Sequence, residues 1–517
     1  MLAAPLALFS CPTKPIVEHW RFDMKRIIRL AGTFVLAGAT APAAPGQAIL
    51  REWYADATTS YIGTAVESFA DLDGDGFGDV AYSTGFLGTT GYEVRSGKTG
   101  ALLWKQKVGV NSLHALPDFD GDGRSEVGTT ASKSVEVRSG ATGNLLYSIL
   151  LGLFDFPLSM VGIGDVDGDG VADLAVGTPG GYRSASPNGE VKVFSGATGT
   201  RLYAVSGAGN LDQFGSIVTT LPDVNGDGIA DFAAGAPTGT VPSLGQRVGY
   251  VRACSGADGA TLWQFDGQMR FASLGRQLAT TSDHNGDGLG DLCISSTSDV
   301  NGVGSGRLWI VDSVSGAVVT TTDGPDGFDV GTRLVDAGDV DGDGWRDLLA
   351  RTSRDQTWLY SGKTLLTLHT FEDLRGTSNG WAMATGHDVD GDGRADVVLG
   401  DFTAQNSAPY FGIVSIHGGN DLFLDMTPIE VADGDSLYRS IRTGVPGNLA
   451  LLAIVEDNGV PVFWILGGLR TFDATGTVEE TVIVPPGLAG NVYAYQGWAI
   501  NARGKLSSSD LIDVTFR

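Results

Sequence analysis

Acidic side chains recur along this chain at a fixed spacing. A nine-residue segment, Asp-x-Asp/Asn-Gly-Asp-Gly-x-x-Asp/Glu, occurs seven times, and its copies open at Asp71, Asp118, Asp165, Asp223, Asp283, Asp339 and Asp388. Each copy holds three or four carboxylates. A folded chain tolerates such a density of negative charge when a hard cation lies among the oxygens. Calcium binding is therefore the first prediction.

The spacing within each segment fits the way calcium is bound, with about six to eight oxygen ligands in flexible geometry. Side chains at positions 1, 3 and 5 can point inward, glycines at positions 4 and 6 let the backbone wrap, position 7 offers its carbonyl, and position 9 closes the shell. The predicted ligands, in chain order, are Asp71, Asp73, Asp75, Phe77, Asp79; Asp118, Asp120, Asp122, Arg124, Glu126; Asp165, Asp167, Asp169, Val171, Asp173; Asp223, Asn225, Asp227, Ile229, Asp231; Asp283, Asn285, Asp287, Leu289, Asp291; Asp339, Asp341, Asp343, Trp345, Asp347; and Asp388, Asp390, Asp392, Arg394, Asp396.

Two other interpretations of these loops are weaker. An EF-hand needs a bidentate Glu at position 12, but position 12 is here Tyr82, Thr129, Val176, Ala234, Ile294, Ala350 and Leu399. Magnesium is less favoured as the ion because it demands rigid octahedral geometry. Acidic turns that bind no metal are also disfavoured, because the same spacing occurs in seven copies. We predict up to seven Ca²⁺ ions, one per repeat, in a structural role.

The elements that would position these loops are short strands. The loops start 47 to 60 residues apart, a period typical of propellers and repeat arrays. Each repeat has four runs of apolar and β-branched residues, which in the third repeat are residues 160–163, 174–176, 191–194 and 201–205. Such runs, bounded by Gly and Asp, predict strands, and four strands per repeat predict a propeller blade.

A second recurring segment, Ser-Gly-x-Thr-Gly, separates the third and fourth runs, at residues 96–100, 139–143 and 195–199, with a near copy at 255–259. Its glycines can supply the positive φ that tight hairpins need. Residues 49–55 form an extra strand before the first acidic loop, and the seventh repeat lacks a fourth strand. We therefore expect the N-terminal strand to complete the seventh blade and close a ring.

The chain ends have a different character. Residues 1–48 are predicted to be a leader with a signal peptide that starts at Met24, because Lys25 and Arg26 precede an apolar stretch. That stretch is short for a membrane span, so we expect no transmembrane anchor. Residues 420–517 hold alternating apolar runs and turn clusters, which suggest a small β-sandwich of immunoglobulin-like size. The predicted location is secreted, either extracellular or at the cell surface.

Charge and cysteine content narrow the function further. The net charge is −26, and the seven loops hold 26 of the 60 carboxylates. Seven divalent ions would still leave a net negative chain, which phosphate backbones repel, so we expect no nucleic acid partner. Cys11, Cys254 and Cys293 form no disulfide framework. Cys254 and Cys293 are expected to be buried fillers, with a disulfide between them as the alternative.

The acidic loops and their flanks resemble the FG-GAP repeats of seven-bladed propellers in integrin α-subunits and in exported bacterial proteins. The fourth repeat carries the full signature: residues 214–216 read Phe-Gly-Ser, residues 223–231 are the acidic loop, and residues 235–237 read Gly-Ala-Pro. The resemblance covers residues 49–419. It implies a calcium-loaded propeller outside the cytoplasm, and it does not transfer a ligand.

The histidines form no zinc-protease motif, since none of them lies in HExxH. We predict no enzyme activity. The leading hypothesis is a monomeric, non-enzymatic adhesion or surface-interaction protein that binds an extracellular protein or glycan. The alternatives are a carbohydrate-binding protein and a non-catalytic scaffold of a secreted hydrolase or lyase. The candidate contact residues lie in the variable stretches away from the acidic loops, and they are Tyr182, Arg183, Arg247, Trp381 and Tyr410.

Overall fold

The computed structural model describes most of the chain after residue 48. The described ranges are 49–55, 61–85, 91–181, 184, 186–241, 246–268, 272–297, 305–324, 328–341, 343–354, 356–371, 381–389, 394–407, 410–418 and nine strands between residues 423 and 516. Within these ranges, no helix has the length and apolarity that a membrane crossing requires.

Seven four-stranded antiparallel sheets, which we call blades 1 to 7, follow one another along residues 49–417. Blade 1 contains β2 (Val66–Phe69), β3 (Asp79–Thr84), β4 (Gly91–Ser96) and β5 (Leu102–Gln106). Blade 2 contains β6 (Ser112–Leu116), β7 (Glu126–Thr130), β8 (Ser134–Arg138) and β9 (Leu145–Leu150). Blade 3 contains β10 (Ser159–Ile163), β11 (Asp173–Thr178), β12 (Glu190–Phe194) and β13 (Arg201–Ser206). Blade 4 contains β14 (Ile217–Thr220), β15 (Phe232–Ala236), β18 (Tyr250–Cys254) and β19 (Thr261–Asp266), with a hairpin of β16 (Thr240–Val241) and β17 (Gln246–Arg247).

The remaining blades have the same order. Blade 5 contains β20 (Leu278–Thr280), β21 (Leu292–Ser296), β22 (Arg307–Val311) and β23 (Val318–Asp323). Blade 6 contains β24 (Val330–Gly338), β25 (Asp347–Thr352), β26 (Thr357–Tyr360) and β27 (Thr367–Phe371). Blade 7 contains β28 (Ala382–His387), β29 (Asp396–Ser407), β30 (Tyr410–His417) and β1 (Ile49–Tyr54).

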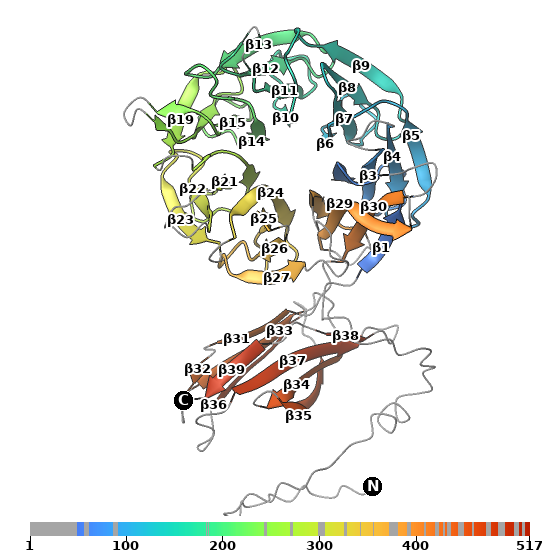
Figure 1. Cartoon of the computed structure of the whole chain (residues 1–517), viewed down its shortest axis with the longest axis vertical. Coiled ribbons are helices and arrows are strands. Elements are labelled where there is room, and N and C mark those ends of the chain that lie inside the picture. Colours follow the sequence, from blue (N-terminus) through green and yellow to red (C-terminus); the bar gives the residue numbers. More distant parts are fainter. Residues whose placement is uncertain are drawn as a thin grey trace, which may run out of the picture. The chain divides into compact units, whose positions relative to one another are not determined.

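The blades form a closed ring. The first strand of each blade contacts the first strand of the next, from β2 through β6, β10, β14, β20 and β24 to β28, and β28 contacts β2 again (Figure 1). This arrangement is a seven-bladed β-propeller, which confirms the predicted fold class for this part of the chain.

The ring closes through the N-terminal strand. β1 pairs antiparallel with β30 as the outermost strand of blade 7, as the strand count predicted. Trp53 of β1 lies opposite Val414, and its ring centroid lies 5.6 Å from that of Tyr82 in blade 1. Strands from opposite ends of the propeller sequence thereby hold the ring shut, and β1 gives blade 7 its fourth strand.

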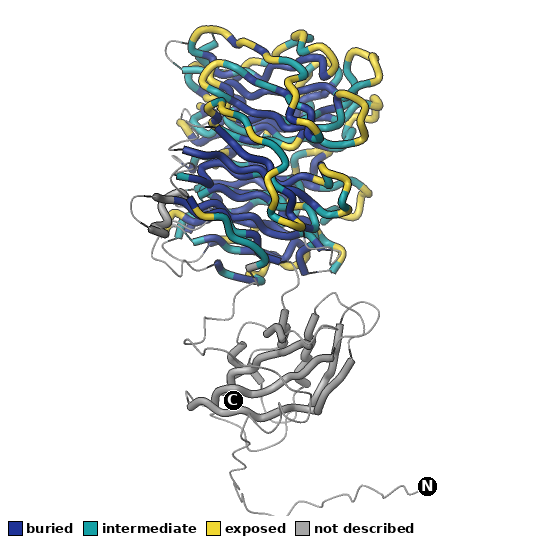
Figure 2. The backbone as a smooth tube through the Cα atoms, turned by 90° about the vertical axis from the view of Figure 1, so that its right-hand side faces the viewer, coloured by how far each residue is buried: buried dark blue, intermediate teal, exposed yellow. Residues whose placement is uncertain are grey.

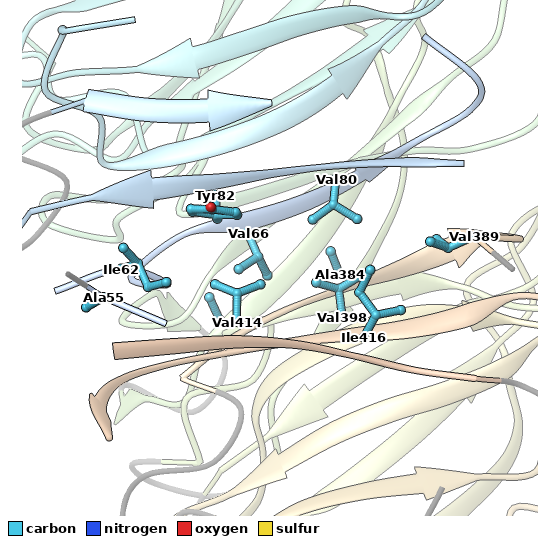
Figure 3. Close-up of a cluster of buried hydrophobic side chains, with 11 residues drawn as sticks. Ala55, Ile62, Val66, Val80, Tyr82, Ala384, Val389, Val398, Val414 and Ile416 are labelled. Atoms are coloured by element: carbon cyan, nitrogen blue, oxygen red, sulfur yellow. The ribbon is translucent and has the colours of Figure 1, made fainter. Parts of the chain in front are cut away.

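The core lies between adjacent blades. All six residues of β11 are buried, whereas β13, the outer strand of the same blade, alternates exposed and half-buried positions. Figure 2 shows the same gradient around the propeller, with buried strands and exposed loops. Between blades 7 and 1, Val66 and Tyr82 pack against Val398 and Val414 (Figure 3). Because both faces of each blade are covered, the second strands of blades 1 to 6 are buried along their whole length rather than at alternate residues.

The two glycines of the Ser-Gly-x-Thr-Gly turn have different roles. The last glycine has the predicted positive φ, for example 68° at Gly199. The first glycine is needed for a close approach instead: a Cβ on Gly196 would lie 1.8 Å from the carbonyl oxygen of Ala172 in the acidic loop. The same contact occurs at Gly97, Gly140, Gly256 and Gly362. The sequence-based reasoning assigned positive φ to both glycines and missed this second function.

Both described cysteines are free and buried, as expected for filler residues. Cys254 lies in β18 and Cys293 in β21, so they belong to adjacent blades. Burial raises the pKa of the Cys254 thiol to about 12, which leaves it protonated and unreactive at neutral pH. The alternative of a disulfide between them is not realised.

The C-terminal part is also made of strands. They are β31 (Phe423–Thr427), β32 (Glu430–Val431), β33 (Ser436–Arg442), β34 (Leu449–Asp457), β35 (Val460–Thr471), β36 (Thr477–Ile483), β37 (Val492–Ile500), β38 (Leu506–Ser508) and β39 (Ile512–Phe516). One sheet has the order β31-β33-β36, and the other has the order β32-β39-β37-β34-β35, with β38 paired to β37. The immunoglobulin-like architecture stays a prediction.

The close approach at the turn generates a stability test. We expect Gly196→Ala to lower the free energy of unfolding by about 1–3 kcal/mol, because the added methyl overlaps the Ala172 carbonyl and the loop must shift. Gly181→Ala is the matched control, since its Cβ would meet no atom within 4 Å. Urea unfolding of both variants measures the difference, and equal midpoints would show that the turn does not hold the acidic loop.

Candidate metal centres

The acidic loops lie on one face of the propeller. Each loop joins the first and second strands of its blade, and the Ser-Gly turn joins the third and fourth strands at the same end. We call this end the acidic face. The variable stretches between the second and third strands lie at the other end, which we call the variable face. This separation follows from the alternation of connections in an antiparallel blade.

Backbone N–H groups fix the first acidic residue in the middle of its loop. In blade 1, Asp71 accepts hydrogen bonds from the N–H groups of Gly74 and Gly76 at 2.5 and 2.7 Å. These glycines have φ of 86° and 87°, which an L-residue with a side chain rarely adopts. Asp73 in turn accepts from the Asp75 N–H at 3.1 Å. The loop therefore wraps around carboxylate oxygens, as a cation-binding loop must.

The carboxylate at position 9 is fully buried in all seven loops. In blade 3, one oxygen of Asp173 accepts from the Val166 N–H at 2.7 Å, and the other accepts from the Gly196 N–H at 2.8 Å. The first bond stays within the acidic loop, and the second crosses to the Ser-Gly turn. The bond within the loop is present in every blade, and its acceptors are Asp79, Glu126, Asp173, Asp231, Asp291, Asp347 and Asp396.

The fifth blade shows what the turn glycine contributes. Ser313 takes the place of the glycine there, and its backbone N–H still acts on Asp291 by lowering the pKa of that carboxyl against the effect of burial. Oδ1 of Asp291 is buried, and its contact with the turn is less well aligned than the crossing bond of blade 3. The crossing interaction is therefore weaker where serine replaces the glycine.

Four loops bring three carboxylates together. In each group, one oxygen per residue lies within 4.8 Å of the others. Two oxygens bound to the same Ca²⁺ at about 2.3–2.6 Å lie no more than roughly 5 Å apart, so these groups fit a calcium ion. The groups are Asp71, Asp73 and Asp79; Asp118, Asp120 and Asp122; Asp165, Asp167 and Asp173; and Asp339, Asp341 and Asp347.

Without a bound cation, desolvation and mutual repulsion of the carboxylates oppose this clustering. Burial raises the pKa of Asp79 to about 7, and the carboxylates of Asp73 and Asp75 add to the rise against two backbone hydrogen bonds. Burial likewise raises the pKa of Glu126 to about 7, and Asp120 contributes. A divalent cation among the oxygens would favour the ionised form of all these groups and remove the mutual repulsion.

The groups differ in detail from the predicted ligand sets. Position 5, as at Asp75, Asp169 and Asp343, lies outside the groups of blades 1, 3 and 6. In blade 2, Glu126 lies outside the group, because its longer side chain is held by N–H groups of the loop and of Gly140. These positions would need a small movement or a bridging water to reach an ion.

The fourth and fifth loops use an amide at position 3. Asn225 donates to Asp227 at 2.8 Å, and Asn285 donates to Asp287 at 3.1 Å. The rest of each loop repeats the pattern of blade 1, with Asp223 and Asp283 accepting from the two loop glycines. In the seventh loop, Asp390 and Asp392 lie outside the described residues.

Side chains at position 7 link neighbouring loops, a role that the sequence-based reasoning missed by considering only their carbonyls. Arg124 of blade 2 donates to the Leu72 carbonyl of blade 1. Arg394 of blade 7 donates to the Val340 carbonyl of blade 6 at 3.0 Å. In both cases the acceptor is the residue at position 2 of the preceding loop. An arginine at position 7 of a repeat is therefore the sequence feature that could have predicted this link to the repeat before it.

The link between blades 5 and 6 uses rings. Trp345 at position 7 packs edge-on against His284 at position 2 of the preceding loop, with centroids 5.1 Å apart. The two ring nitrogens of His284 lie 2.8 and 2.7 Å from the carbonyl oxygens of Ser282 and Gly362. His284, expected to be a neutral spacer, therefore connects two blades. Gly78 makes the corresponding link from blade 1 to blade 7.

The candidate contact residues on the variable face have separate environments. Trp381 is half-buried and Arg247 is exposed. Tyr182 and Arg183 lie outside the described residues, and Tyr410 is described only as the first residue of β30.

Comparisons with known proteins agree with this geometry. Residues 161–194 and 214–252 match the FG-GAP repeat, and residues 339–399 match the FG-GAP-like repeat. Integrin alpha-V of Gallus gallus is 27% identical over 223 residues, which cover 38% of this chain and 21% of the integrin. Integrin alpha-5 of Xenopus laevis is 24% identical over 238 residues, which cover 41% of this chain and 22% of the integrin. The matches therefore span about a fifth of each relative.

A likeness among solved structures concerns the fold alone. A chain from the crystal structure of BBS1N in complex with ARL6DN, soaked with mercury, superposes with a TM-score of 0.50 at 10% sequence identity, covering 72% of this chain and 97% of the other. The repeat matches and the ring of seven blades together show that this chain carries FG-GAP repeats on an integrin α-like seven-bladed β-propeller.

Proposed function

We propose that this chain is an exported calcium-binding propeller that acts as a non-enzymatic adhesion or surface-interaction protein. The observation that carries the calcium part is the repetition of one acidic group, with the same hydrogen bonds, on one face of successive blades. Acidic residues on an ordinary surface have no reason to repeat this geometry.

Calcium has a structural role in this proposal. In five blades the acidic loop is bonded to the Ser-Gly turn of its own blade, and several loops contact the loop of a neighbouring blade. An ion that fixes one loop therefore restrains two further elements. The ring is stabilised in proportion to the occupancy of its loops, because the ion binds the folded chain and not the unfolded one.

The adhesion part rests on the likeness to integrin α-chains and on the division of the propeller into two faces. In this proposal the acidic face binds calcium, so the longer loops of the variable face can differ in sequence between blades. Recognition residues are usually found in such surface loops. Export rests on the basic and apolar segment after Met24. A carbohydrate ligand is the second candidate, favoured by the half-buried Trp381 on the variable face.

Removal of calcium should destabilise the propeller. At a calcium concentration of 100 times Kd, each site contributes about 2.7 kcal/mol, and each kcal/mol shifts the melting temperature of a large domain by about 2–4 °C. In differential scanning calorimetry we expect excess chelator to lower the melting temperature by roughly 5–11 °C for each site that loses its ion. Calcium, but not an equal ionic strength of sodium chloride, should restore it. An unchanged melting temperature in excess chelator would contradict a structural role for calcium.

The effect of chelator should depend on pH. The folded pKa of about 7 at Asp79 and Glu126 exceeds the value of about 4 in an unfolded chain. Between these values the folded chain retains protons that the unfolded chain has lost, so stability without calcium falls as the pH rises from about 4 to about 7. With calcium bound, this decline should disappear. Parallel slopes with and without calcium would contradict the assignment.

Single loops can be tested by metal stoichiometry. Asp165→Asn keeps the shape of the first ligand of blade 3 but removes its charge, and we expect it to lower the calcium content by about one ion per chain and weaken binding at that loop by tenfold or more. Asp258→Asn is the control, because Asp258 is an exposed acid on the same face outside the loops. Calorimetric titration and elemental analysis provide the readout, and identical stoichiometry for both variants would remove Asp165 from the ligand set.

The interaction role is tested with the whole purified chain. We expect it to bind cell-surface proteins in calcium and to lose them in chelator. A glycan array with the same chain distinguishes the two candidate functions. Glycan binding that is lost in Trp381→Ala would favour a carbohydrate-binding protein. Turnover of a polysaccharide or phospholipid by the pure protein would overturn the non-enzymatic assignment.

A further inference from the structure

Blade 6 departs from the other blades at one buried position. Four residues after the position-9 acid, three blades have a glycine that lies against the glycine at the entrance of the next blade. These pairs are Gly177 with Gly215, Gly235 with Gly275, and Gly400 with Gly63, and a Cβ on the first glycine would lie 2.0–2.4 Å from the carbonyl of the second. Blade 6 has Arg351 at this position, and its side chain is 7% exposed. In blades 1, 2 and 5 the same position holds Ser83, Thr130 and Ser295. A guanidinium therefore occupies in blade 6 a joint that elsewhere holds glycine, serine or threonine.

A second arginine stands directly opposite. Arg333 of β24 is the cross-strand partner of Arg351 of β25. Like charges in directly opposed positions destabilise a strand pair. The ring of Trp381, at the start of β28, lies 5.8 Å from the Arg333 guanidinium carbon and 5.5 Å from that of Arg351. Each cation thus meets the same aromatic ring, a contact that stabilises a guanidinium.

A third arginine adds to the positive charge. Desolvation, together with the positive charges of Arg351 and Arg276, lowers the pKa of Arg333 to about 10. A guanidinium normally stays above about 12, so this environment is strongly unfavourable for another cation. Within the described part of the chain, neither Arg276 nor Arg333 forms an ion pair with a carboxylate.

The aromatic ring between the arginines is held in place. Trp381 packs against the hydrophobic cluster between blades 7 and 1. Arg276 lies two residues before the first strand of blade 5, and Trp381 immediately precedes the first strand of blade 7. Arg351 lies near the end of β25 that is remote from its acidic loop. The cluster therefore belongs to the variable face, and the calcium loops are at the opposite ends of the same strands.

We propose that Arg276, Arg333, Arg351 and Trp381 form a binding site for a tetrahedral oxyanion, namely the phosphate or sulfate group of a ligand. Arginine presents forked N–H donors that bind such oxygens in pairs, and an anion between opposed guanidiniums turns their repulsion into attraction. The half-buried position of Arg333 excludes part of the water that would screen this attraction. The site goes beyond the calcium-dependent function and does not depend on it.

The test is calorimetric titration of the whole calcium-loaded chain with sodium sulfate, then with phosphoserine and galactose 6-sulfate to distinguish the two sources. We expect saturable binding and a rise in melting temperature with sulfate. Arg333→Gln should weaken binding by tenfold or more, and Arg333→Lys, which keeps the charge but loses the fork, should weaken it less. Arg247→Gln is the control, since Arg247 is an exposed arginine elsewhere in the propeller.

Three results would overturn the proposal. One is the lack of saturable binding of sulfate and both esters by the folded wild-type chain. Another is equal binding by the wild-type, Arg333→Gln and Arg333→Lys chains. A lower melting temperature of Arg333→Gln without any anion effect would also contradict it, because this result indicates that the arginines are satisfied within the protein. Calcium stoichiometry should be the same in all variants, which separates this test from that of the acidic loops.

Discussion

The propeller depends on a buried carboxylate at the ninth position of each acidic loop. This group has no exposed surface in any of the seven blades, and it ties its loop together and, in five blades, reaches the neighbouring turn. Burial makes the bare charge unfavourable, and the adjoining carboxylates increase the cost. A cation among the oxygens would stabilise the ionised form of these carboxylates. The position-9 carboxylate therefore both holds the loop and turn together and favours the binding of a metal ion.

Two kinds of contact extend this local order around the ring. Side chains at position 7 connect an acidic loop to its neighbour, as Arg124 and Arg394 do with hydrogen bonds and Trp345 does with a ring contact. The first strands contact one another in a closed circle, and β1 completes the last blade. Restraint of one acidic loop therefore also restrains the neighbouring blades. The sequence differences between blades lie on the variable face and include the arginine cluster around Trp381.

Much of this could be predicted from the sequence because the repeat is local. The nine-residue spacing, the four apolar runs and the spare N-terminal strand fix the blade, the blade count and the closure. Contacts across strands and between blades could not be predicted in the same way. The close approach of Gly196 to Ala172 and the opposition of Arg333 and Arg351 depend on strand register within one blade. The role of His284 depends on which blade follows which.

The central claim is that cations neutralise the clustered carboxylates of the acidic face. Diffraction from crystals grown in calcium, recorded at a wavelength where calcium scatters anomalously, tests this most directly. The account predicts an anomalous peak about 2.3–2.6 Å from oxygens of Asp71, Asp73 and Asp79, and an equivalent peak in the other loops. Loops that keep the same hydrogen bonds but hold only water, at calcium concentrations in the millimolar range, would contradict it.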